Sequence, residues 1–240
     1  MKKLILAFVT LSHLAIAQTT EPVASTPKER KIALGLSFSP DYSYRSLKGI
    51  SANGKAIAEL RNNTELPVFA FTSGVKLSTL LKKRFTFETG ILFSQKGYKQ
   101  KPQELISQIY DPAIAKSFAY QITYSGIDVP IKLNFYPVKT TKGGLFISAG
   151  IANNLIMSNK VTYTSEYYNA PSQTVKDIKM GLLYMPSLLL SVGYQQQLSE
   201  RLFLKAEPSY RRALLDLNGS TLIKTYLYSM GLDVSLFLKL

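Results

Sequence analysis

Four carboxylates stand out in this sequence because they interrupt segments in which every second residue is apolar. These residues are Glu88, Asp128, Glu207 and Asp233. Two of them held close together could act as a general acid and a general base. Lysines and arginines occupy equivalent polar positions, however, and a carboxylate beside a cation usually stays ionised and inert. The pattern therefore favours a network of ion pairs over a catalytic site, formed by Lys76, Glu88, Lys96, Asp128, Lys132, Lys205, Glu207, Arg211 and Asp233.

Residue types that often carry catalysis or bind metals are missing. The chain has no cysteine, and its single histidine, His13, falls within a predicted leader. Disulfides, cysteine or histidine zinc sites and serine–histidine or cysteine–histidine relays are therefore excluded from the mature protein. We expect no enzyme activity, no cofactor and no metal.

Residues 1–17 have the features of a secretory signal peptide. Lys2 and Lys3 precede an apolar stretch over 4–17 that ends in small residues, which predicts cleavage before Gln18. An uncleaved membrane helix is disfavoured because the apolar stretch is too short and polar residues follow it. The remaining chain divides into a periplasmic linker at 18–30 and one domain at 31–240.

The charged positions belong to segments with the period of a β-strand. The sequence over 225–240, TYLYSMGLDVSLFLKL, has an apolar residue at every even position, and mostly polar or small residues between them. Such alternation indicates a strand with one apolar face and one polar face. Seven other segments share the pattern, at 31–45, 68–78, 85–98, 127–135, 145–155, 187–195 and 201–211.

The connections between these segments alternate in length. Short ones contain TLLKKR, PVKTTKG and LSER, whereas long ones fill 46–66, 99–117, 158–183 and 213–223. An even number of strands with short turns at one end and long loops at the other is typical of outer-membrane barrels. The predicted fold is all-β, an eight-stranded antiparallel up-and-down transmembrane β-barrel with short periplasmic turns and long extracellular loops.

Several details refine this barrel. Seven strands carry one glycine on the polar face, which a narrow barrel needs for curvature and close packing. Apolar residues are even over 118–124 and odd over 127–135, which predicts a β-bulge near Ser125 and Gly126. Pro130 and Pro186 predict a bulge or an unpaired position near a strand end. Tyrosines toward the long-loop ends suggest an interfacial girdle, at Tyr42, Tyr44, Tyr120, Tyr124, Tyr184, Tyr210, Tyr226 and Tyr228.

Five stretches carry a resemblance to a known family: SPDYSYR, ETGILFSQKGY, YSGIDVPIKLNFYP, LFISAG and YSMGLDVSLFL. Together, over 31–240, they resemble the outer-membrane β-barrel family of Bacteroidetes that is often labelled PorT-like. The most specific elements are SQKGYK and the Asp-Val-Pro run at 128–130. The resemblance implies an integral outer-membrane protein of a Gram-negative cell, usually without an assigned activity. One branch is similar to a component of a secretion system, and the resemblance transfers no functional residue.

Charge and loop composition suggest the partners. The formal charge of +14 becomes +12 once Lys2 and Lys3 are removed, but the basic residues are scattered in ones and twos. We therefore expect contacts with outer-membrane lipid and lipopolysaccharide, and no nucleic acid. Residues 53–67 and 104–120 look locally helical, and the tyrosine-rich 161–173 forms a further loop that could bind a protein partner.

Several functions remain open from the sequence. The favoured one is a non-catalytic outer-membrane barrel with a structural or surface-interaction role and a plugged polar lumen, since eight strands leave little open bore. The alternatives are a narrow pore for small solutes, or an accessory component of a secretion system. A soluble lipocalin-like carrier is a third alternative.

Overall fold

Eight antiparallel strands close into a barrel in the computed structural model, which describes residues 32–105, 115–167, 172–217, 219 and 221–240. The predicted signal peptide (1–17) and the linker (18–30) therefore lie outside the described residues, as does Lys31. The elements are β1 (Ile32–Gly49), α2 (Ala52–Thr64), β2 (Glu65–Lys82), β3 (Phe85–Gln100), β4 (Gln103–Glu104), β5 (Ala115–Lys139), β6 (Gly143–Tyr167), β7 (Gln173–Gln197), β8 (Leu202–Ala213) and β9 (Ile223–Lys239).

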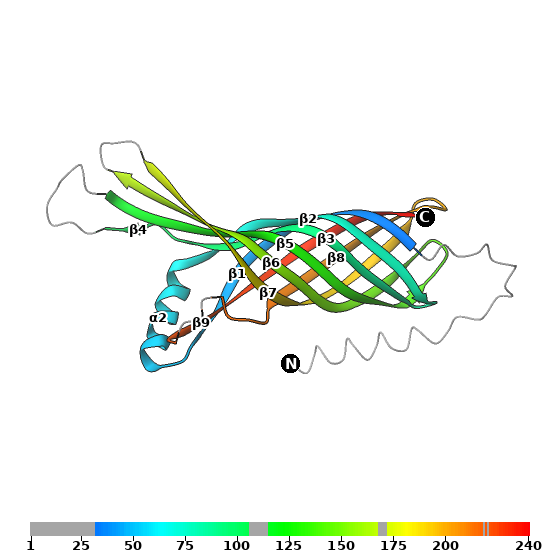
Figure 1. The fold of residues 1–240 in the computed structure, drawn as a ribbon, viewed down its shortest axis with the longest axis horizontal. Helices are drawn as coiled ribbons and strands as arrows, with labels where there is room; N and C mark the ends of the chain where they lie inside the picture. The colour runs from blue at the N-terminus through cyan, green and yellow to red at the C-terminus, as the bar shows by residue number, and fades with distance from the viewer. Residues whose placement is uncertain (1–31, 106–114, 168–171, 218, 220) are drawn as a thin grey trace, which may run out of the picture.

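The first and last strands complete the ring (Figure 1). β1 pairs with β9 over a long antiparallel ladder that includes Leu36 opposite Leu236, and β3 pairs with β5. The remaining neighbours follow the chain order, and the two-residue β4 adds to the outer part of β5 without joining the ring. The predicted eight-stranded up-and-down fold is confirmed for the described residues.

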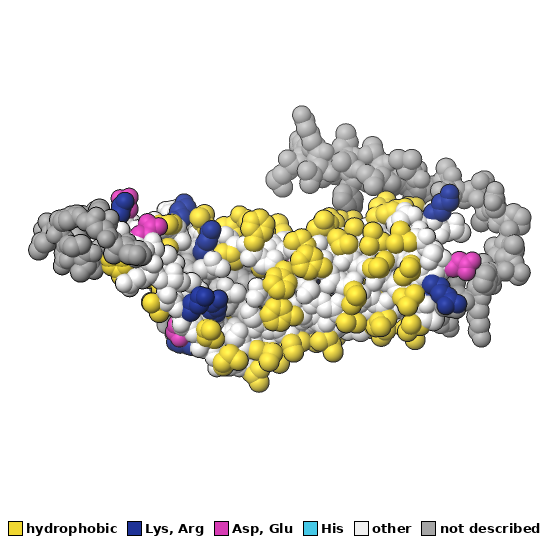
Figure 2. Space-filling model, turned by 90° about the horizontal axis from the view of Figure 1, so that it is seen from above, with side chains coloured by type: hydrophobic (Ala, Val, Ile, Leu, Met, Phe, Trp, Pro, Cys, Tyr) yellow, Lys and Arg dark blue, Asp and Glu magenta, His cyan; other side chains and the backbone are white. Residues whose placement is uncertain are grey.

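The wall of the barrel is apolar on its outside, as the alternation requires. In β1 the burial of successive residues alternates strictly between exposed and buried from Ile32 to Ser43. Outward side chains such as Leu36, Phe69 and Ile91 are 67–87% exposed. Figure 2 shows hydrophobic side chains spread over the middle of the barrel wall, while Lys, Arg, Asp and Glu gather toward its two ends.

The two ends of the barrel differ in structure. At one end, which we call the short-turn end, the strands are joined by residues 83–84, 140–142 and 198–201. The opposite end, the long-loop end, carries α2, which begins after Ser51, whose hydroxyl accepts a hydrogen bond of 3.1 Å from the Gly54 amide. This helix confirms the prediction for 53–64, whereas residues 65–67 of the predicted segment belong to β2. Among the described residues, no helix is long and apolar enough to cross a membrane.

Two predicted loops are wrong in part because strands continue through them. The loop predicted at 158–183 is largely strand, since β6 continues to Tyr167 and β7 begins at Gln173. The loop predicted at 99–117 begins within β3, which continues to Gln100, contains β4 at 103–104 and ends within β5, which begins at Ala115. The described part of the segment at 104–120, predicted to be locally helical, is therefore mostly strand. Residues 106–114 and 168–171 lie outside the described residues.

The outer parts of β5, β6 and β7 form a three-stranded extension that we call the blade, comprising residues 115–125, 158–167 and 173–184. In Figure 1 it projects away from the long-loop end of the ring. Its base coincides with two register shifts, one between β5 and β6 at Ser125 and Gly126, the other between β6 and β7 at Ile156 and Ser158. Bulges bend strands and increase their twist, which explains why the blade leaves the direction of the ring.

The predicted position of the bulge is confirmed, but the predicted change of face in β5 is not. Ser125 pairs with Ser158 and Gly126 with Ile156, so the extra residue is Met157 in β6. In β5 the even-numbered residues face the interior on both sides of this point, because Tyr124 is buried, as are Gly126 and Asp128. Tyr124 therefore lies inside the barrel mouth and not in a lipid-facing girdle, which corrects that prediction.

The two prolines lie where ladders are interrupted. Pro130 falls in a gap of the β3–β5 ladder, between the pairs that Ile131 and Asp128 make with β3. Pro186 precedes the first β7–β8 pair, which is formed by Ser187. Proline cannot donate a backbone hydrogen bond. Because Pro130 has no partner on β3 and Pro186 has none on β8, the missing donor breaks no hydrogen bond of those two ladders.

Candidate functional site

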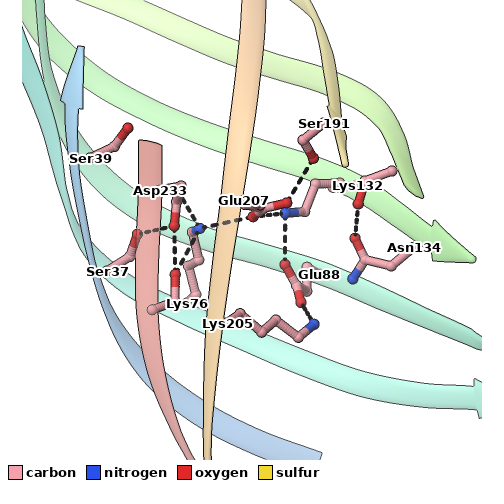
Figure 3. A network of polar contacts seen from close by, with 12 residues as sticks. Ser37, Ser39, Lys76, Glu88, Lys132, Asn134, Ser191, Lys205, Glu207 and Asp233 are labelled. Atoms are coloured by element: carbon pink, nitrogen blue, oxygen red, sulfur yellow. Dashed lines mark hydrogen bonds and ion pairs between the residues drawn. The ribbon is translucent and has the colours of Figure 1, made fainter. Parts of the chain in front are cut away.

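The interior of the barrel is filled by three layers of side chains. A central layer is charged, an aromatic layer lies beneath it at the short-turn end, and an apolar layer lies above it at the long-loop end. All nine residues that the sequence singled out point inward, and none is more than 6% exposed. Figure 3 shows how the central part of this network draws side chains from strands on opposite sides of the barrel.

Glu88 and Glu207 form the centre of the charged layer. Glu88 forms an ion pair with Lys132 at 3.0 Å and accepts a hydrogen bond from Lys205, so one carboxylate neutralises two buried cations. Glu207 accepts from the same Lys132 and from the Ser191 hydroxyl at 2.7 Å. Lys132 thus links the two carboxylates, which come from β3 and β8.

A second group of pairs lies next to this centre. Lys76 donates to Asp233 at 2.6 Å, and the Ser37 and Ser235 hydroxyls donate to the other oxygen of Asp233. Arg211 donates to Asp41 at 3.2 Å, and its second terminal nitrogen is 3.8 Å from Asp233. These contacts join β1, β2, β8 and β9. The Lys76 ammonium also lies 3.8 Å from Glu207, which connects the two groups.

Asp128 and Lys96 are the two predicted residues that the network does not bring into direct contact with an opposite charge. Asp128 is 1% exposed and neither carboxylate oxygen has a hydrogen-bond partner among the described residues. Within the charged layer, a cavity of about 10 Å³ borders Ser209 and Arg211, which also carry unpaired polar atoms. A volume of this size accommodates about one water molecule.

The aromatic layer closes the lumen at the short-turn end. Tyr136, Phe146 and Phe237 are at most 1% exposed, and Phe203 stacks on Phe237 with ring centroids 5.0 Å apart. The Lys205 ammonium lies 5.0–5.9 Å from the centroids of all four rings, a range in which cation–π attraction acts.

Two glycines make this layer possible. A methyl group at Gly35 would come within 2.6 Å of the Phe237 ring, and one at Gly193 within 2.6 Å of the Phe146 ring. Each large ring therefore occupies the space that the side chain directly opposite it on the neighbouring, paired strand would otherwise fill. This is a packing reason for glycine at these inward positions.

An apolar cluster closes the long-loop end of the lumen. Its members are Tyr98, Tyr124, Ile156, Met185, Ala213, Leu217 and Leu227. Above it, Glu65 at the end of α2 accepts from Arg45 at 2.6 Å and from Arg61 at 2.7 Å. Burial alone would lower the pKa of Arg61, but the hydrogen bond and charge of Glu65 more than offset it and hold that pKa above its ordinary value.

The charged layer offers little for catalysis. Its two central carboxylates are separated by the shared Lys132, and each accepts from a second donor, so neither is placed as a free acid or base. No group of three or more potential metal ligands occurs among the described residues. The arrangement is that of a polar core which fixes strands on opposite sides of the barrel.

Sequence reasoning missed several interior residues. Asp41 and the aromatic layer were not identified, although Asp41 follows Gly35, Ser37 and Ser39 at odd positions of one strand. The inward phenylalanines also carried a signal, because Phe237 is a large apolar residue at an odd, otherwise polar position of the final strand. The pair of Arg45 and Glu65 could not be found this way, since helix α2 separates them in the sequence.

The blade presents a different kind of site, a free strand edge. β7 pairs with β6 from Gln173 to Gln196, apart from the register shift at 181–182, but its pairs with β8 begin at Ser187. Residues 173–184 of β7 are all exposed, including Val175 (61%), Ile178 (57%) and Met180 (76%). Among the described residues, no other strand pairs with this edge.

Comparisons with known proteins identify a family. The chain matches the outer membrane protein beta-barrel domain over residues 16–216. Similar solved structures include Neisserial surface protein A, with 10% identity over 87% of this chain and 97% of that chain and a TM-score of 0.42. They also include the outer membrane protease OmpT from Escherichia coli, with 9% identity over 92% of this chain and 100% of that chain and a TM-score of 0.43. A third is the attachment invasion locus protein Ail of Yersinia pestis, with 10% identity over 87% of this chain and 99% of that chain and a TM-score of 0.35. No curated protein matches the chain.

Proposed function

Because the chain belongs to the outer membrane protein beta-barrel domain family, we propose that it is a sealed, non-catalytic anchor that presents the blade to a protein partner at the cell surface. The observation that carries this proposal is the free edge of β7 over 173–184. The short-turn end then faces the periplasm and the blade faces the outside.

The edge of β7 has the properties of a docking strand. Twelve residues of strand extend over about 40 Å and leave every second pair of backbone N–H and C=O groups directed away from β6. Proteins usually protect such an edge by shortening, bulging or covering it. Here the edge is long and apolar in places, interrupted by Lys176, Asp177 and Lys179. An extended segment of a partner could add to it as a further strand.

The filled lumen supports the anchoring role over the alternative of a narrow pore. Aromatic, charged and apolar layers occupy the interior in succession, and the aromatic layer alone contains three rings that are at most 1% exposed. We expect no stable single-channel openings from the purified protein in planar lipid bilayers. Stable openings of constant conductance would favour the pore.

Lipid and lipopolysaccharide are the proposed partners of the barrel wall. Exposed leucine, isoleucine, valine and phenylalanine side chains stand outward from seven of the eight ring strands, and Leu202 and Leu204 of β8 are partly exposed; this is the surface that hydrocarbon would cover. In soluble proteins an exposed apolar surface of this extent is rare. Fractionation of cells should therefore recover the protein with membranes and release it only in detergent.

The PorT-like branch and an accessory role in secretion remain proposals of finer detail. The PorT-like assignment is supported by the motifs SQKGYK on β3 and Asp-Val-Pro at 128–130 on β5. Gly97 of the first motif donates its amide hydrogen to the Ser43 hydroxyl at 2.9 Å, and Tyr98 lies in the apolar cluster. An accessory role would need the partner that the blade is proposed to bind.

Hydrogen exchange tests the docking strand even while the partner is unidentified. Deuterium uptake is measured for peptides covering 173–184, both in outer-membrane fragments from the native cell and in the purified protein. We expect slower uptake in the native fragments, because partner pairing would protect the edge amides. A peptide covering 233–239 at the β1–β9 seam is the control and should not change. Equal uptake of 173–184 in both samples would refute the docking strand.

A further inference from the structure

The short-turn end of the barrel opens into a cavity of about 620 Å³, which we call the vestibule. All eight ring strands contribute to its lining. Tyr136 and Phe203 of the aromatic layer form its floor, which separates it from the charged layer. Its volume lies in the range of about 300–1,000 Å³ that is usual for ligand pockets.

The vestibule is basic, and its cations differ from those in the lumen. Lys139, Arg201 and Lys239 line it, and Glu200 is the one acidic residue among the described lining residues. The end of β2 and the adjoining turns add further exposed cations, at Lys82, Lys83, Arg84 and Lys142. Apart from Lys239, none of these cations forms an ion pair in the part of the chain that the structure describes, whereas most lumenal cations are paired. Unpaired cations around a concave site concentrate positive potential and attract anions.

The neutral part of the lining narrows the chemistry of the anion. Half of the neutral lining residues carry hydroxyl or amide side chains, including Thr86, Thr140 and Gln195, which can hydrogen-bond to carboxylates and to peptide groups. Sugars usually stack on an exposed aromatic face, but Tyr136 is 1% and Phe203 is 5% exposed. Phospholipid headgroups would lie around the outside of the ring, whereas the vestibule lies within it.

We propose that the vestibule binds an acidic, carboxylate-rich segment of a periplasmic protein. Only the compartment of this partner rests on the proposed function, because the charge and the shape of the vestibule do not depend on the blade. The barrel would then hold one partner at each side of the membrane.

Binding is tested with the purified protein in phosphatidylcholine nanodiscs and a fluorescein-labelled hexaglutamate peptide, followed by fluorescence anisotropy. We expect saturable binding that weakens with salt, and none with labelled hexaglutamine. The variant K139Q/R201Q should bind about three- to tenfold more weakly, because it removes two exposed charge contacts. The variant E200Q should bind more tightly.

The matched control is K48Q/K224Q, which removes two exposed lysines that face each other on β1 and β9 at the long-loop end. It should bind hexaglutamate like the unmodified protein. Equal weakening in both double variants, or no saturable binding at low salt, would overturn the proposal. Equally tight binding of an oligogalacturonate of the same charge would also overturn it, because it would indicate a glycan ligand. Displacement of hexaglutamate by dihexanoyl phosphatidylglycerol would overturn it as well, because it would indicate a lipid ligand. These results are independent of the deuterium uptake measured over 173–184, so a failure of this proposal can be distinguished from a failure of the proposed docking strand.

Discussion

Removing the Glu88 carboxylate isolates a buried cation, and the resulting loss of stability can be estimated from the structure. Glu88 is the one carboxylate that pairs with Lys205 among the described residues, and Lys205 is 1% exposed. Lys132, the other partner of Glu88, retains Glu207. The substitution Glu88→Gln therefore leaves Lys205 charged, buried and without a counterion.

Breaking one partner of a buried ion pair typically costs about 3–5 kcal/mol. The aromatic rings around Lys205 recover part of this, because desolvated cation–π contacts contribute about 2 kcal/mol or more. The glutamine also still accepts a hydrogen bond from one lysine. We expect Glu88→Gln to lower the free energy of unfolding by about 2–3 kcal/mol, which shifts a urea midpoint by roughly 1 M.

A second substitution separates the charge effect from general disruption of the core. In E88Q/K205M the isolated cation is replaced by an apolar side chain of similar length, which suits the ring environment. Replacing both partners of a buried pair is often neutral or stabilising. The double variant should therefore regain most of the lost stability, whereas E88Q/K132M should not, because Lys205 stays unpaired.

The assay is reversible urea unfolding in detergent micelles, followed by tyrosine fluorescence and by circular dichroism. Coincident transitions would justify a two-state treatment. A loss below about 1 kcal/mol for Glu88→Gln, or a double variant E88Q/K205M no more stable than the single one, would refute the role assigned to this pair.

Three further predictions concern the other layers. Gly35→Val should destabilise the barrel by about 1–3 kcal/mol in the same unfolding assay, because its side chain overlaps the Phe237 ring; an unchanged midpoint would contradict this packing. The double substitution Phe146→Ala and Phe237→Ala should speed the acylation of Lys205 by a lysine-reactive ester, measured by mass spectrometry, because it removes two of the rings that cover this lysine. An unchanged acylation rate would show that these rings do not shield Lys205. Glu65→Gln should accelerate hydrogen exchange in α2, while the exposed Glu59→Gln should not; equal rates would argue against the Arg45 and Arg61 contacts.

The strands within the membrane were predictable because one of their faces is apolar throughout. Alternation located all eight ring strands, since a period of two survives wherever one side is apolar and the other polar. The blade gives no such signal. Around Thr162 and Thr174 the side chains on both faces are partly or fully exposed, so strand and loop have similar composition there.

Interior apolar residues were the other source of error. Tyr124 and Phe237 are apolar residues inside the barrel, and alternation alone cannot distinguish contact with lipid from contact with an interior cluster. The partners within the charged layer were also beyond the sequence. Lys205 on β8 reaches Glu88 on β3 across the lumen, a pairing that depends on strand tilt and stagger.

The seam between β1 and β9 joins residues about two hundred positions apart, such as Ala33 and Lys239. Until β9 is in place, both β1 and β8 present unsatisfied amides and carbonyls, which hydrocarbon does not tolerate. Stable insertion must therefore wait for nearly the whole polypeptide, and a contact this distant in the chain slows the search for it. A C-terminally shortened product would keep these strand edges unpaired, and it would therefore remain a substrate for chaperones and proteases.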